Sequence, residues 1–319
     1  MATVVPPLPL VPLHFGTNLT APSSAVPSGR DTFSFPLPLS VQTWAVQMVV
    51  FHAVGLLFEA MDHVPALRSS KVRATRKSQY MHLLPNVLRN QILVLLPFMF
   101  LMEVFGLAFV GPSLHPIRFL VNLPLMALGH EIIQYVGHRY ILHAPNVFLM
   151  KFLRHSVHHS TRASSAISAC YMSPIDFFIE IGCPYLVPLS LVGGGGSGRF
   201  FHFLIAGAGA IGGLYEHSGY DFAVSFRPKF ENLGEKPMSE QEKETAYKLL
   251  ERPSFVTTFL ADFLDNRAHL EHHMRGYVSF SDGFGSPSIL DTLLRTKWDL
   301  SDRRRADVER EWARQHRDE

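Results

Sequence analysis

The chain is poor in charged residues, in cysteine and in tryptophan for its length of 319 residues. Charged residues make up 18% and hydrophobic residues 47% of it, whereas soluble proteins carry roughly 25% charged residues. A water-soluble surface would be hard to build from this composition. Two cysteines are too few for a disulfide framework. A net charge of +2 provides no basic field for nucleic acid, which is therefore not an expected partner.

Long apolar segments take the place of the missing charge. The first, Leu39 to Phe58, is uncharged over 20 residues, which at about 1.5 Å per residue covers the roughly 30 Å hydrocarbon core of a bilayer. The sequence therefore predicts an all-α integral membrane bundle. Its expected spans are 39–58, 84–110, 117–136 and a helical hairpin at 175–214.

The hairpin and the loop after the first span leave alternatives open. The first arm of the hairpin carries Asp176, Glu180 and two prolines, so it is expected either to span the membrane fully or to be re-entrant or interfacial. The segment Arg68–Lys77 has five basic residues and no acidic one, which marks the cytoplasmic side. The alternative reading of this segment is a docking surface for an acidic electron-transfer partner.

The two ends of the chain differ from the apolar middle. Residues 1–38 contain 8 of the 22 prolines and no apolar period, which is typical of a flexible tail. Residues 299–319 are highly charged and are expected to be solvated. The predicted membrane domain is 39–298, with a cytoplasmic histidine-rich helical cap formed by 137–174 and 215–298.

Histidine is the residue in excess, with 17 copies. Two triplets have the spacing H-x-x-H-H, and helix positions i, i+3 and i+4 share one face, so each triplet is expected to present three imidazoles to a single point. So many imidazoles exceed what one ion can bind, which implies two metals. An all-nitrogen site with open positions favours iron for dioxygen chemistry over structural zinc. The clustered histidines are His138, His143, His155, His158, His159, His269, His272 and His273.

The stretch before the first triplet needs a break in its helix. His138 and His143 are five residues apart, about 140° around a regular α-helix, so we expect a π-bulge or a helix end near Ala144-Pro145. Glu131, Tyr135 and His138 share a face, so Glu131 and Tyr135 are predicted to support the metal ligands from behind. The alternative for Glu131 is an ion pair with a neighbouring arginine such as Arg139.

Both histidine clusters must lie on the same side of the membrane if they bind the same metals. The hairpin at 175–214 contributes two crossings, or none if it re-enters, and either number satisfies this condition. Counting from the basic loop, the second and third spans return the chain to the cytoplasm just before His138. A histidine-rich metal transporter is the alternative of another class, although the triplets lie in polar sequence and not within the spans.

These motifs resemble the membrane-bound fatty acid hydroxylase and sterol desaturase superfamily. The resemblance is carried by His138-Arg-x-x-x-His143, His155-x-x-His158-His159 and His269-x-x-His272-His273, in that order. His217-Ser-Gly-Tyr-Asp-Phe222 and Leu290–Thr296 are similar to segments of C-4 methylsterol monooxygenases. The resemblance implies that His217 is a further metal ligand and that the nine histidines are the catalytic set.

The resemblance also implies a function. Members are membrane enzymes of the endoplasmic reticulum that use two iron ions and O2 on the cytoplasmic face to oxidise a C–H bond. The expected substrate is sterol-like or otherwise lipophilic, with fatty-acyl, sphingolipid or terpenoid hydroxylation or desaturation as the alternative. Electrons are expected from NAD(P)H through cytochrome b5, a reductase or a similar carrier, because the chain lacks a nicotinamide-binding glycine motif.

Overall fold

The computed structural model describes six ranges of the chain, all within the compact unit Leu37–Glu319. In these ranges the structure is helical, and the isolated bridge between Lys71 and Tyr220 is their one β pairing. The predicted all-α class is confirmed. The tail predicted at 1–38 lies almost entirely outside the described residues, as does that at 299–319. The described ranges are 37–72, 80–110, 116–192, 198–225, 255–281 and 288–298.

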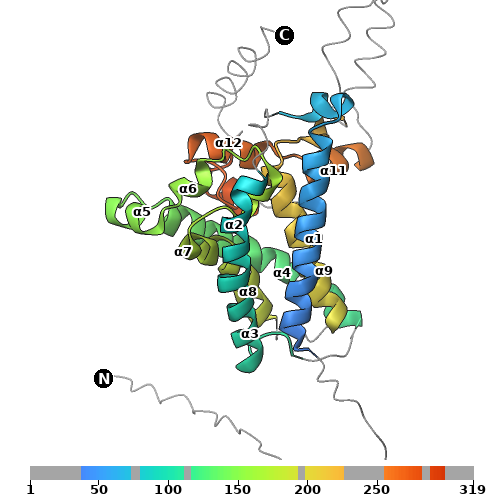
Figure 1. The fold of residues 1–319 in the computed structure, drawn as a ribbon, viewed down its shortest axis with the longest axis vertical. Coiled ribbons are helices and arrows are strands. Elements are labelled where there is room, and N and C mark those ends of the chain that lie inside the picture. Colours follow the sequence, from blue (N-terminus) through green and yellow to red (C-terminus); the bar gives the residue numbers. More distant parts are fainter. Residues whose placement is uncertain are drawn as a thin grey trace, which may run out of the picture. The chain divides into compact units, whose positions relative to one another are not determined.

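The helices follow one another in the order shown in Figure 1. Several of the longer ones are made of α-helical pieces joined through a π-helical turn. The short 3-10 turns are η1 (Pro65–Ser70), η4 (Ala166–Cys170) and η6 (Phe222–Ser225). The other elements are α1 (Leu39–Met61), α2 (Tyr80–Asn90), η2 (Gln91–Leu95), α3 (Leu96–Val104), α4 (Pro116–Val136), η3 (Gly137–Leu142), α5 (Val147–Leu153), α6 (Ser156–His159), α7 (Pro174–Phe177), η5 (Phe178–Gly182), α8 (Cys183–Leu191), α9 (Arg199–His217), α11 (Phe255–Phe263), α12 (Arg267–Arg275) and α13 (Ile289–Leu293).

Within the described ranges, four helical stretches are long and apolar enough to cross a membrane, and the chain is a membrane protein as predicted. Large apolar side chains such as Val49, Leu93 and Leu120 are exposed on them, as contact with lipid requires. The first arm of the predicted hairpin is one of the four, whereas its second arm, α9, is not. The four stretches are Leu39–Met61, Tyr80–Val104, Pro116–Leu142 and Pro174–Leu191.

Proline accounts for the position of the π-helical turns. A proline has no N–H to donate, and its ring displaces the carbonyl four residues earlier, so the helix before it widens. Pro97 follows η2, Pro145 follows η3 and Pro184 follows η5, in each case by no more than three residues. Each wide turn changes which side chains face the interior of the bundle, and two of the three lie at the site described below.

The second span ends earlier than the predicted residue 110. Gly106 has a φ of +66°, and its N–H donates to the carbonyl of Glu103 while that of Leu107 donates to the carbonyl of Met102. This pair of bonds is a Schellman motif, which glycine favours because it lacks a Cβ. The helix therefore stops at Val104.

The helices pack closely where small residues allow it. A Cβ at Gly129 of α4 would lie 2.8 Å from the Cβ of Pro188 in α8, so the α4–α8 contact requires glycine there. At the end of the bundle where α3 ends, the carboxylate of Glu103 accepts hydrogen bonds from the N–H groups of Leu39 and Ser40 at the start of α1. A negative charge at a helix N-terminus stabilises it. Figure 1 shows α6 and α12 at the opposite end of these long helices.

Candidate metal centre

A π-helical turn places the first two histidines of the site. The N–H of His143 donates to the carbonyl of His138, five residues earlier, at 2.9 Å. This widened turn brings the two rings onto one side, with their centroids 5.0 Å apart. The helix then ends at Leu142, with His143 as its C-cap residue, ahead of Pro145. Both alternatives predicted from the spacing, the bulge and the helix end, occur together.

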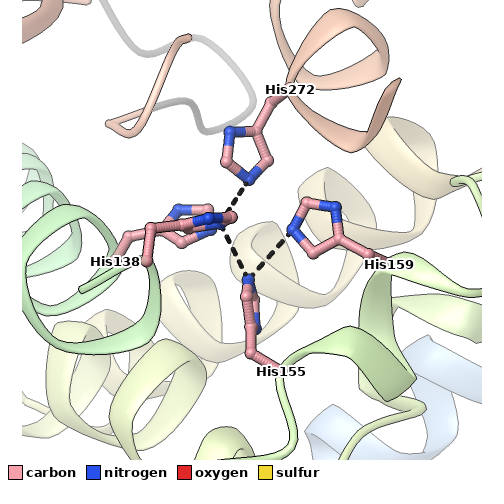
Figure 2. Close-up of side chains that lie close together, drawn as sticks. His138, His155, His159 and His272 are labelled. Atoms are coloured by element: carbon pink, nitrogen blue, oxygen red, sulfur yellow. Dashed lines mark hydrogen bonds between the residues drawn. The ribbon is translucent and has the colours of Figure 1, made fainter. Parts of the chain in front are cut away.

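The first histidine group gathers residues from η3, α6 and α12, and from the positions next to η3 and α6, around one point. Its Nε2 atoms are unusually close: that of His155 lies 3.1 Å from that of His143 and 3.0 Å from that of His159. Figure 2 shows His138, His155, His159 and His272 turned toward one another. One ligand atom from each of the five lies within 4.8 Å of all the others. The group consists of His138, His143, His155, His159 and His272.

The second histidine group lies beside the first. The Nε2 of His217 is 3.1 Å from that of His158 and 3.0 Å from that of His269. His273 completes the group, with its ring centroid 4.5 Å from that of His269. It also links the two groups, because its centroid is 4.6 Å from that of His159. All nine predicted histidines are therefore brought together, and the two triplets lie at the same end of the bundle.

The triplets are arranged differently from the prediction. We expected each to present all three rings to one point, but both divide between the two groups. In each triplet the residues at i and i+4 belong to one group and the residue at i+3 belongs to the other. His155 and His159 lie in the first group and His158 in the second, whereas His269 and His273 lie in the second group and His272 in the first. The reason is that consecutive residues on a helix point about 100° apart. Each short helix therefore contributes to both groups.

Hydrogen bonds at the far nitrogen fix which nitrogen faces the centre. The Nδ1 of His138 donates to the carbonyl of Phe280, that of His272 to the carbonyl of Val278 and that of His217 to the carbonyl of Gly213. A carbonyl only accepts, so each Nδ1 carries the proton and each Nε2 presents a lone pair. Lone pairs facing one another at about 3 Å repel unless a cation lies between them. Among the residues that the structure describes, the Nε2 of His138 is buried without a hydrogen-bond partner, so the residues fit a metal.

A carboxylate holds the loop that orients two of these rings. Asp291 accepts from the N–H of Phe280 at 3.0 Å and from the N–H and hydroxyl of Ser281 at 2.7 and 2.8 Å. The hydroxyl of Thr296 also donates to it. Asp291 thus fixes the segment 278–281, whose carbonyls receive the Nδ1 protons of His138 and His272. Sequence similarity pointed to the stretch 290–296 but did not reveal this contact.

Glu131 and Tyr135 lie one step further from the metal ligands than predicted. Glu131 accepts from the N–H of Leu290 at 2.8 Å and from the hydroxyl of Ser281 at 3.4 Å, so these bonds go to the segments next to Asp291 and not to an imidazole. The alternative pairing with Arg139 is not seen either, because Arg139 donates to the hydroxyl of Tyr135. That hydroxyl also lies 3.3 Å from the hydroxyl of Thr296.

Burial keeps the imidazoles outside the membrane spans neutral. Loss of solvent lowers the pKa of His143 to about 3 and that of His159 to about 4, from an ordinary value of 6.5, with repulsion by neighbouring rings adding to it. The same causes lower the pKa of His155, His158 and His272 well below 6.5. Neutral imidazole is the form that binds a metal.

Two buried carboxylates belong to the site although the sequence analysis did not place them there. Asp176 accepts from the Nδ1 of His155 at 2.9 Å, and Glu180 lies beside it. His155, Asp176 and Glu180 can offer ligand atoms within 4.8 Å of one another. The signal that could have revealed them was present, because an acidic residue in an apolar, membrane-length segment marks a functional site more often than a topological irregularity.

Comparison with known proteins identifies the family. The family model described as fatty acid hydroxylase matches residues 123–296, a range that holds all nine histidines and both buried carboxylates. Searches of curated proteins and of solved structures gave no significant match. Since the family model covers more than half of the chain, the protein belongs to the fatty acid hydroxylase family, within the superfamily of membrane hydroxylases and desaturases.

Proposed function

We propose that the protein is a membrane di-iron oxygenase that hydroxylates or desaturates a C–H bond of a sterol-like or other lipophilic substrate with O2. The observation that carries this proposal is the convergence of nine imidazoles in two adjacent groups, with lone pairs turned inward. Two iron ions held there would supply dioxygen activation. Family membership supports an oxidoreductase of this kind.

The residues of the chain prepare the centre in three ways. Asp291 and the carbonyls of Val278 and Phe280 hold His138 and His272 in the tautomer that binds a metal. Burial keeps the rings neutral. The apolar helices below the centre, whose exposed side chains suit lipid, favour a substrate that partitions into the membrane.

The substrate is the part that rests on sequence similarity. The segments His217–Phe222 and Leu290–Thr296 favour a sterol-like substrate. The four residues between His138 and His143 resemble fatty-acid 2-hydroxylases instead, which supports fatty-acyl, sphingolipid or terpenoid substrates as the second candidate. Profiling sterols, acyl lipids and terpenoids by mass spectrometry distinguishes them, because hydroxylation adds one oxygen and desaturation removes two hydrogens.

The proposed setting is the endoplasmic reticulum membrane with the centre on the cytoplasmic side. The basic residues of Arg68–Lys77 support this orientation, although residues 73–77 lie outside the described ranges. Electrons come from NAD(P)H through cytochrome b5 or a similar carrier in this proposal. Membrane lipid is the second partner.

The test replaces one ligand and one unrelated histidine. His272→Ala should lose turnover by at least about 100-fold, because removal of the groups that merely orient a metal ligand already costs 10–100-fold. Insertion into microsomes should be unchanged. His82→Ala, which removes an exposed ring on α2, is the control and should keep full activity. Full activity in the His272→Ala protein would contradict the proposal. Metal flux across the membrane without oxygen consumption would also contradict it and would favour a transporter.

A further inference from the structure

Glu180 lies between the two histidine groups. It sits in the π-helical turn η5 and is 5% exposed. Its Oε1 is 3.9 Å from the Nε2 of His138 and 3.5 Å from the Nε2 of His158. His138 belongs to the first group and His158 to the second. A single carboxylate oxygen therefore faces one nitrogen of each group.

Both of these nitrogens point toward the centre of their group. The Nδ1 of His138 bonds to the carbonyl of Phe280, which leaves its Nε2 as a buried lone pair with no partner among the described residues. The Nε2 of His158 is 3.1 Å from that of His217, at the centre of the second group. A carboxylate oxygen only accepts when ionised, so it would repel the lone pair of His138. A cation between the oxygen and that nitrogen removes the conflict, and the Nε2 of His158 is close enough to the same oxygen for a second cation.

The local backbone explains how a residue of a membrane-length helix reaches this position. Pro184 cannot donate to the carbonyl of Glu180, and the helix widens into the turn 178–182 just before it. Asp176, one turn earlier, accepts from the Nδ1 of His155 at 2.9 Å, and the Oε2 of Glu180 lies 3.4 Å from the same nitrogen. The two carboxylates are thus held against one histidine ligand, which limits the rotation of Glu180.

We propose that Glu180 is a metal ligand shared by both ions, an oxygen bridge between the two histidine groups that the nine-histidine set does not include. This inference rests on the proposed function, since it needs two metals at the centre. Carboxylate is a ligand that iron and manganese accept readily. Asp176 is then a positioning residue, which acts on the metals only through Glu180 and His155.

The experiment uses the full-length protein in detergent or nanodiscs, loaded with Mn²⁺ as the probe. A shared carboxylate transmits magnetic exchange between two Mn²⁺ ions, so the wild type should bind two ions and give the electron paramagnetic resonance spectrum of a coupled pair. Glu180→Gln keeps the shape of the side chain and should lose the coupling, with affinity for at least one ion falling about 10-fold or more. Glu180→Asp keeps the charge and should bind both ions more tightly than the Gln variant.

The control is Glu103→Gln, which removes a carboxylate at the opposite end of the bundle and should retain two coupled ions. Wild-type protein that binds no metal would overturn the proposed function together with this inference. Wild-type protein that binds two uncoupled ions would overturn the role of Glu180 alone, whether or not the variants fold. A Gln variant with wild-type stoichiometry, affinity and coupling would do the same.

Discussion

The two histidine groups use the same side chain but are supported differently. In the first group, His138, His272 and His155 each have an Nδ1 partner supplied by a backbone carbonyl or a carboxylate. In the second group, His217 has such a partner, but the Nδ1 of His158 and both nitrogens of His273 have none in the described part of the chain. The first group is therefore oriented by the protein, whereas the second would need a bound metal to complete its orientation.

The hydrogen bonds that orient the rings are concentrated at the first group. The segment 278–281, held by Asp291, serves only the first group. A group whose ligands are already fixed loses little freedom on binding a metal, and so it binds more tightly. We expect two sites of unequal affinity in a centre whose ligand lists look almost interchangeable in the sequence.

Removing the support of the first group should have the largest effect. Asp291→Asn weakens the bonds to Phe280 and Ser281, so the affinity of the first site should fall 10–100-fold while the second site is unchanged. A Co²⁺ titration followed by absorption resolves the two steps. Asp265→Asn, which changes a turn where Asp265 accepts from the N–H of Arg267, is the control. Equal weakening of both steps by Asp291→Asn would remove the distinction between the groups.

Graded metal removal should separate the groups without mutation. With increasing chelator the second group should release its ion first, at a concentration about 10-fold lower than the first, because fewer of its rings are held by outer partners. His217→Ala, which lacks a ligand of the second group, should show only the release that needs the higher chelator concentration. The comparison fails if that variant instead retains only the ion that is easily removed.

Acid should destabilise the metal-free protein through two histidines of the first group. The pKa of His143 is lowered to about 3 and that of His159 to about 4, whereas in the unfolded chain both remain near 6.5. Between these values the unfolded state binds more protons, so stability rises with pH and falls as the pH drops from about 6.5 toward 4. The melting temperature in detergent from pH 8 to 4.5 measures this. The double variant His143→Ala, His159→Ala should flatten the slope, and an unchanged slope would contradict the assignment.

The smallest effect is expected at the glycine that ends α12. Gly276 has a φ of +67°, and a Cβ there would meet the Cε1 of His143 only at 3.6 Å. Gly276→Ala should therefore cost about 1–2 kcal/mol of stability from backbone strain and leave metal affinity within a few-fold of wild type. Gly209→Ala, in open space, is the control for a glycine without strain. Loss of metal from the Gly276 variant would show that the second triplet tolerates less backbone movement than its contacts indicate.

Much of the fold could be predicted because membrane helices can be recognised in a sequence by their length and apolar composition. The first span began where the sequence placed it, at Leu39. The error at the second span came from Gly106, since an apolar stretch does not reveal where a left-handed residue will end a helix. In the hairpin, the sequence shows Asp176 and Glu180 only as acidic residues in an apolar segment. Their role is not visible there because their partners lie on other segments of the chain.

The site, too, could be predicted from the sequence only in part. The nine histidines and the break between His138 and His143 could be inferred from spacing, since both follow from helical geometry within a few residues. The partner of Glu131 could not, because Glu131 reaches across 159 residues to Leu290. No periodicity connects positions so far apart.

The sequence alone determined that apolar helices would carry a histidine-rich site, because hydrophobic length and the angular repeat of a helix are local properties. Only the tertiary structure decided how the nine rings divide between two groups, which carbonyls turn them inward and which carboxylate stands between them. Those outcomes depend on the packing of segments that are distant in the chain, where a rotation of one helix by a single residue would send its histidines to a different point.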